Sequence, residues 1–273
     1  MATEIISGQL GEIRAASTAG GGTALTTTAG YIQLPYRSSH IFITPRNFAS
    51  SAVVVKFALN PWLAVLKTSD NMVSVPTDYS KIAQDASTST DVGVGGLDTL
   101  ANGDFLLVGA PLPFRGAYAD VDTASTAAAS TLTVAYWNGI GWTSASATDG
   151  SSDATRPFAN DGLVYWTVPA AGLWQVAKIK DLYPTVPAFP DYYDVDLFWT
   201  RWVVSVAVTA TATLNSLVAA NRSTAYAELL SGQLFEAKIH HGPMGIGCVE
   251  ALTDAGTANL IVNVATLRDG RYE

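Results

Sequence analysis

Residues 131–137 read Thr-Leu-Thr-Val-Ala-Tyr-Trp, and the dipeptide Asn138-Gly139 follows directly. The second, fourth and sixth residues of this stretch are apolar, which is the alternation expected of a β-strand with one buried face. Asn-Gly is a strong signal for a tight hairpin turn, because both residues tolerate a positive φ. We therefore expect a β-hairpin whose return strand starts at Trp142.

Similar short apolar or alternating stretches recur along the chain between turn residues, and helical periodicity is nearly absent. They cover residues 53–59, 105–108, 163–168, 195–208 and 260–264. Such spacing predicts antiparallel β-sheets. The fold class expected is all-β: an antiparallel jelly-roll-like β-sandwich inserted into or joined to a smaller β-domain. Two further hairpins are expected, one pairing 53–59 with 64–67 and one pairing 248–252 with 260–264.

Composition shifts suggest where the domains lie. Residues 1–30 are rich in Gly, Ala and Thr and are expected to form an N-terminal extended arm. Residues 76–104 are loop-like and provide the best candidate for a linker. The prediction is therefore an outer β-domain built from 31–100 plus 223–273, and a β-sandwich at 101–222.

One internal similarity brackets the predicted sandwich. Residues 4–14 read EIISGQLGEIR, and residues 228–238 read ELLSGQLFEAK. The two segments are either equivalent strands of a duplication or a coincidence in a sequence of low complexity. Their positions agree with a discontinuous outer domain, since chain ends that lie close together tolerate an insertion.

The composition narrows the possible functions. Of the 273 residues 48% are hydrophobic and only 14% are charged, against roughly 25% charged in typical soluble proteins. The net charge of −8 argues against nucleic acid and against acidic membrane surfaces as partners. A surface that is polar through hydroxyl and backbone groups suits contact with other protein subunits, because neutral polar groups cost less to desolvate than charges.

Motifs that carry catalysis or cofactors are sparse, so no cofactor and no enzyme activity are expected. No nucleotide-binding glycine loop and no G-x-S-x-G motif occurs in the sequence. The only cysteine, Cys248, is expected to be a small buried residue. Asp191, Asp194 and Asp196 either form a loose calcium site or lie at the solvated start of a strand. No basic and apolar leader typical of secretion is visible at the N-terminus.

The seven tryptophans offer a binding hypothesis. An indole buries a large apolar area, so the core is the usual place for one. We expect Trp166 and Trp202 to be core residues. Trp142 and Trp174 remain candidates for contact with a glycan or a protein partner.

Several segments together resemble a module of tailed-bacteriophage structural proteins. They are 113–118, 132–143 with its YWNG-x-x-W hairpin, 149–150, 162–169 and 196–202. The resemblance covers about residues 105–215, with Phe198 where the module usually has Tyr, and residues 181–194 look like a loop insertion. It implies a jelly-roll fold similar to carbohydrate-binding domains, and it carries over no catalytic residue.

The leading hypothesis is a non-enzymatic structural component of a tailed bacteriophage virion, either a capsid decoration protein or a tail, neck or baseplate adaptor. The expected partners are copies of itself and other virion proteins, and the expected location is the virion. The alternative is a carbohydrate-binding module that recognises host surface glycans. An enzyme with a spatially assembled Ser-His-Asp triad is the third hypothesis.

Overall fold

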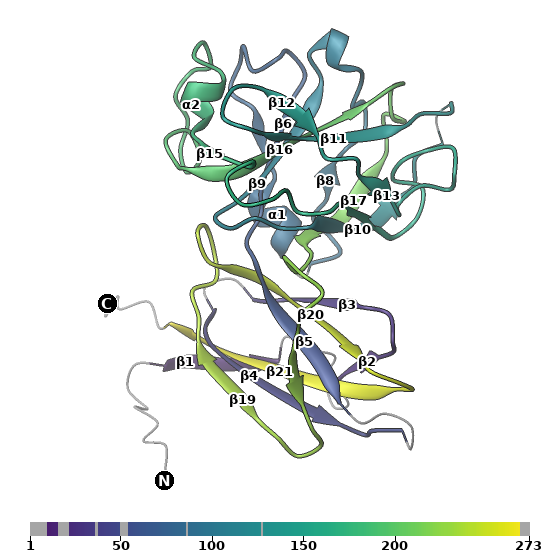
Figure 1. Cartoon of the computed structure of the whole chain (residues 1–273), viewed down its shortest axis with the longest axis vertical. Coiled ribbons are helices and arrows are strands. Elements are labelled where there is room, and N and C mark those ends of the chain that lie inside the picture. Colours follow the sequence, from purple (N-terminus) through teal and green to yellow (C-terminus); the bar gives the residue numbers. More distant parts are fainter. Residues whose placement is uncertain are drawn as a thin grey trace. The chain divides into compact units, whose positions relative to one another are not determined.

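A computed structural model describes residues 10–15, 22–35, 38–49, 54–85, 87–126 and 128–267. The chain forms two compact units, one made of residues 60–224 and the other of residues 1–59 and 225–273. Both units are built from antiparallel sheets (Figure 1). In the described residues the chain has two short α-helices and one 3-10 helix, all in unit 60–224. The all-β prediction is therefore confirmed.

Unit 60–224 contains two sheets. The larger sheet has, in spatial order, β12 (Trp142–Ser144), β11 (Leu132–Trp137), β16 (Leu197–Val204), β9 (Phe105–Ala110), β6 (Ala64–Thr68) and β7 (Thr77–Asp78), with β15 (Val176–Ala177) beside β16. The smaller sheet has β13 (Thr148–Asp149), β14 (Gly162–Tyr165), β10 (Gly116–Thr123), β17 (Thr213–Ala219) and β8 (Val92–Gly93). The helices are α1 (Ser80–Gln84), η1 (Leu100–Asn102) and α2 (Ile179–Leu182).

The predicted hairpin at Asn138-Gly139 is present between β11 and β12. Trp137 pairs with Trp142 across it, and the backbone NH of Asn138 donates to the carbonyl of Gly141 at 3.0 Å. Gly139 has φ 93°, where a side chain would be strained. The Asn138 side chain accepts hydrogen bonds from the NH groups of residues 140 and 141, which fixes the turn from within.

The inner faces of the two sheets enclose the main core. β16 shows how alternation builds it, since Trp202 and Val204 point into this core while Leu197 and Trp199 point to the opposite face. The smaller sheet contributes aliphatic side chains from β10, β14, β17 and β8. This arrangement is a β-sandwich in which strand parity decides which residues are buried between the sheets.

A third layer covers part of the outer face of the larger sheet. Residues 179–197, which include α2, pack their apolar side chains on Phe105, Leu107 and Trp199. Figure 1 shows α2 beside β15 at one side of this sheet. The segment that resembles a loop insertion thus covers a hydrophobic surface, because Phe105 and Leu107 of β9 and Trp199 of β16 are apolar residues of the outer face.

Residues 60–100 lie with the sandwich, whereas the sequence predicts them to be part of the outer domain. β6 pairs with β9 and β8 pairs with β17, so both sheets of the sandwich need this segment. The expected linker at 76–104 contributes Ala83, Val92, Val94 and Leu97 to the main core. Its Ser, Thr and Gly content suggested a loop, but four well-spaced apolar residues were enough to anchor it.

The other unit is a second sandwich. One sheet has the order β1 (Leu10–Ala15), β21 (Ala258–Leu267), β4 (Ser38–Arg46) and β19 (Phe235–Lys238), with β2 (Thr23–Leu25) also paired to β21. The second sheet has β18 (Ala227–Leu229), β5 (Val55–Pro61), β20 (Ile246–Thr253) and β3 (Gly30–Gln33). Its core contains Ile41, Ile43, Phe57, Val249 and Val262.

Two predicted hairpins are wrong. β20 pairs with β5 and β3, whereas β21 pairs with β4, β1 and β2, so the 248–252 and 260–264 strands lie in different sheets. β5 and β6 also lie in different sheets. In both cases the short connection carries the chain from one sheet to another, and local turn signals do not distinguish such a crossing from a hairpin.

The expected arm at 1–30 is part of the second sandwich wherever the structure describes it. β1 pairs with residues 263–267 of β21, and β2 pairs with residues 258–260 of the same strand. Residue 30 begins β3, which pairs with β20. Residues 1–9 and 16–21 lie outside the described part of the chain.

Within the described residues, the two copies of the repeated segment end in opposite edge strands of one sheet, β1 and β19, while residues 228–229 of the second copy lie in β18 of the other sheet. In the sequence alignment Ile13 matches Ala237; in the structure Ile13 pairs with Ala265 and Ala237 pairs with Ile41. Between the central strands, Ile41 pairs with Val264 and Ala265 pairs with His40. Residue 13 corresponds to residue 237 and residue 41 to residue 265 by the same difference in residue number. This correspondence converts the pair formed by Ile13 and Ala265 into the pair formed by Ala237 and Ile41. This agreement favours equivalent strands related by a local two-fold axis over coincidence.

Candidate functional site

Trp174 is a core residue. Only 4% of its surface is exposed, and its indole NH donates to the carbonyl of Trp199 at 3.1 Å. Its ring centroid lies 5.3 Å from that of Phe114 and 5.7 Å from that of Phe198. Because Trp174 presents no open face, it is not available for the glycan or partner contact that the sequence suggested.

Trp142 lies at the margin of the hydrophobic third layer and is partly exposed. Trp137 is its partner across the hairpin, and the centroids of the two rings lie 5.7 Å apart in an edge-to-face arrangement. The guanidinium carbon of Arg201 lies 4.9 Å from the centroid of the Trp142 ring. Trp142 therefore remains a candidate for contact with a glycan or a protein partner, and the structure places the Arg201 cation beside it.

Arg201 is held between aromatic rings. Its guanidinium carbon also lies 5.8 Å from the centroid of Phe105, and Phe105 in turn stacks on Tyr183. Burial raises the pKa of Tyr183 to about 12, against the opposing effect of the Arg201 charge. Tyr183 is thus neutral at pH 7 and gives Arg201 no counter-charge.

The charge of Arg201 is not balanced by an ion pair. Within the described residues no carboxylate lies within ion-pair distance of it, although Arg156, Lys178 and Lys180 all have such partners. Its Nε is buried and makes no hydrogen bond there. A partly buried cation without an ion-pair partner favours an anionic ligand.

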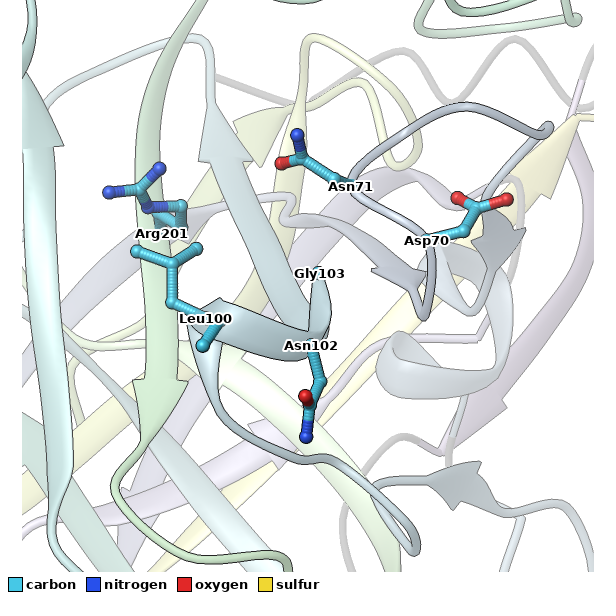
Figure 2. Close-up of a pocket in the computed structure, with 7 residues that line it drawn as sticks. Asp70, Asn71, Leu100, Asn102, Gly103 and Arg201 are labelled. Carbon is cyan, nitrogen blue, oxygen red and sulfur yellow. The ribbon is translucent and has the colours of Figure 1, made fainter.

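Arg201 lines an open depression of about 480 Å³. The other lining residues come from two loops, namely Asp70, Asn71, Leu100, Ala101, Asn102 and Gly103. Figure 2 shows Arg201 and Leu100 on one side of the depression and Asp70 on the other, with Asn71 between them. The depression joins a cation, an apolar side chain and two amides.

The two loops hold each other in place. The NH of Asn71 donates to the carbonyl of Gly103 at 2.8 Å. Gly103 has φ 77°, and a Cβ there would lie 2.7 Å from the nitrogen of Asn71, so this position requires glycine. The Asn102 side chain donates to Asp98 at 2.6 Å, which orients its amide.

Asp70 is ionised and directed at its own loop. Its carboxylate accepts hydrogen bonds from Thr68 Oγ1 at 3.0 Å, from the NH of Val73 at 3.1 Å and from the NH of Ser74 at 2.9 Å. Hydrogen bonding from Ser74 is the main cause that lowers the pKa of Asp70. It can still accept a further hydrogen bond, since a carboxylate has about four acceptor positions.

A second exposed feature lies at the hairpin tip. Ile140 is 93% exposed, and Leu173 and Val176 are about half exposed. The NH of Gln175 donates to the carbonyl of Trp137 at 2.9 Å, so the 173–176 segment lies beside the hairpin. We call Ile140, Leu173 and Val176 the hairpin-tip patch. Clustered exposed apolar side chains are typical of interaction surfaces.

The aspartates considered for calcium are arranged differently. Lys178 Nζ lies 2.9 Å and Lys180 Nζ 2.6 Å from Asp194 Oδ1, and Lys178 Nζ also lies 4.0 Å from Asp196. Lysine ammonium groups stand where a cation would bind, and they lower the pKa of Asp194. No cluster of three metal-ligating side chains exists in the described residues. This arrangement favours the solvated strand entry over calcium.

The histidines and the cysteine lie in the other unit. Ser39 Oγ lies 3.2 Å from His40 Nδ1, but these two are neighbours on a paired strand and neither lines the depression. His241 is buried, and its pKa is lowered to about 4, mainly by desolvation. Cys248 is fully buried, which confirms the expectation for this residue.

The chain was compared with protein-family models, curated proteins and solved structures, and none of the three comparisons found a match. In the described part of the chain no helix is long and apolar enough to cross a membrane.

Proposed function

We propose that this chain is a non-enzymatic structural component of a tailed bacteriophage virion, as a capsid decoration protein or a tail, neck or baseplate adaptor. It acts through assembly with copies of itself and with other virion proteins. The resemblance of residues 105–215 to phage structural modules supports the choice of particle. The charge-poor sequence supports a protein that meets neighbours over much of its surface.

The observation that carries the assembly proposal is the hairpin-tip patch. Hairpin tips usually bear polar residues because they project into water, yet Ile140 is almost fully exposed there. Leu173 and Val176, on the segment beside the hairpin, are about half exposed as well. Burying such side chains against a neighbour contributes about 25 cal/mol per Å², so the patch is a suitable contact between subunits.

The test compares Ile140→Asp with Val73→Asp, which places the same charge at an exposed apolar residue outside the patch. We expect the purified protein to be oligomeric by light scattering, Ile140→Asp to shift it to monomer, and Val73→Asp to leave it unchanged. Mass spectrometry of purified particles should find the chain in virions. A monomer at every concentration that is also absent from particles would refute the proposal.

Glycan binding is a second candidate function, and the contact between Trp142 and Arg201 beside the open depression supports it. Apolar, amide and charged groups line it, as is usual in ligand sites. A glycan array probed with the intact protein and with Trp142→Ala tests this function. Binding that weakens in the variant supports it, and an array that shows no binding removes it.

A further inference from the structure

We propose that the depression binds a sugar that carries a carboxylate, and that Arg201 receives the carboxylate. This inference rests on the second candidate function, glycan binding, and not on the assembly proposal. It concerns the lining residues of unit 60–224, namely Arg201, Leu100, Asn71, Asn102 and Asp70.

The case for an anion starts from the position of Arg201. The guanidinium carbon lies 5.8 Å from the centroid of the Phe105 ring and 4.9 Å from that of the Trp142 ring, and these contacts favour this position of the side chain before a ligand arrives. A guanidinium fixed in this way presents planar donors that match the two oxygens of a carboxylate. Since no carboxylate of the described residues pairs with it, the ligand is the natural source of the counter-charge.

The case for a sugar comes from the remaining lining groups. Leu100 is 40% exposed beside Arg201 and offers an apolar surface to the C–H groups of a pyranose ring. Asn71 and Asn102 provide amide donors and acceptors for hydroxyl groups. The Asp70 carboxylate, on the opposite side of the depression, accepts hydroxyl hydrogens and repels a second negative charge.

The same groups argue against other anions. A nucleic acid presents a phosphate at every nucleotide and requires several cations, but the depression has one cation and faces Asp70. An acidic peptide carries repeated carboxylates, but the depression has one cation to receive them, and Asp70 repels the others. A single carboxylate on a hydroxyl-rich ring fits the one cation, the apolar Leu100 and the Asn71 amide.

The experiment measures binding of 3′-sialyllactose and of methyl glucuronide, each against its neutral counterpart, lactose or methyl glucoside, by ligand-observed NMR and calorimetry. We expect the acidic sugars to bind at least tenfold more tightly than the neutral ones. Arg201→Gln should remove this preference, and Arg201→Lys should weaken acidic binding about tenfold, because lysine lacks the planar pair of donors. Asn102→Ala should weaken binding of both sugar types.

Arg156→Gln is the matched control, because Arg156 is a partly exposed arginine of the same unit that pairs with Asp153 and should leave sugar binding unchanged. Unfolding curves of each variant verify that it is folded. Equal binding of acidic and neutral sugars would overturn the inference while leaving glycan binding intact. Binding of no sugar would overturn both. Equal binding of a polyglutamate peptide through Arg201 would overturn the choice of a sugar.

Discussion

The two faces of the larger sheet are built by alternate residues of the same strands, yet they end in different surroundings. On the inner face Trp202 is fully buried, and its indole NH donates to Thr200 Oγ1 at 2.9 Å. On the outer face Trp199 is equally buried under the third layer, but two residues further along the strand Arg201 borders an open depression. The inner face is covered along its whole length and stabilises the fold. The third layer covers the outer face only in part, and the depression lies where this layer ends.

The largest expected effect on stability comes from a substitution on the inner face. Trp202→Ala removes a buried indole and leaves Thr200 Oγ1 without its donor, so we expect a loss of about 3–5 kcal/mol in the free energy of unfolding. Denaturation by urea, followed by tryptophan fluorescence, measures it, because all seven tryptophans lie in unit 60–224. Trp202→Phe should lose clearly less. A loss below 1 kcal/mol for the alanine variant would contradict the assigned core.

The second effect comes from adding a side-chain carbon to the closely packed outer face. A Cβ at Gly109 would lie 2.5 Å from the ring of Trp199, so Gly109→Ala should cost about 1–3 kcal/mol as the indole shifts. The control is Gly141→Ala, where nothing lies within 4 Å of the added carbon. If both variants unfold at the same urea concentration, the packing of Trp199 under the third layer is wrong.

The third effect separates stability from binding at the edge of the cover. Trp142→Ala removes a partly exposed ring, so we expect it to cost only about 1 kcal/mol, the strength of a cation–π contact with limited burial. The same variant should release the Arg201 side chain and weaken acidic-sugar binding. A stability loss as large as that of Trp202→Ala would show that Trp142 is a core residue and not part of the site.

The smallest effect lies on the solvent side of the third layer. Asp194→Asn removes the ion pairs with Lys178 and Lys180, which are exposed and screened by salt. We expect the thermal midpoint to fall slightly at low ionic strength and to match the parent chain in about 1 M salt, where the screening length is about 3 Å. Asp91→Asn is the control. A difference that persists in high salt would contradict a purely electrostatic role.

Local rules predicted some elements well. The 131–143 hairpin follows from alternation and Asn-Gly, and it forms with Trp137 paired to Trp142. The burial of Trp166, Trp202 and Cys248 follows from their apolar surroundings. These features depend on residues a few positions apart, which is the range over which turn chemistry and strand parity act.

Long-range decisions could not be predicted in this way. The sequence does not reveal that β20 and β21 belong to different sheets, because a chain reversal and a crossing between sheets use the same turn residues. It also gave Trp142 and Trp174 equal standing, although one is buried at 4% exposure. The charged residue in the otherwise apolar strand 197–204 was the one available signal for Arg201.

By itself the sequence determined that the chain is all-β and has few charges. It also determined the hairpin at 131–143 and the strands whose alternate residues are apolar. The tertiary structure decided which strands pair, where the third layer ends, and that loops at 70–71 and 100–103 meet Arg201. The physical reason is that strand formation depends on neighbours in the chain, whereas cover, charge balance and the shape of a depression depend on segments far apart in it.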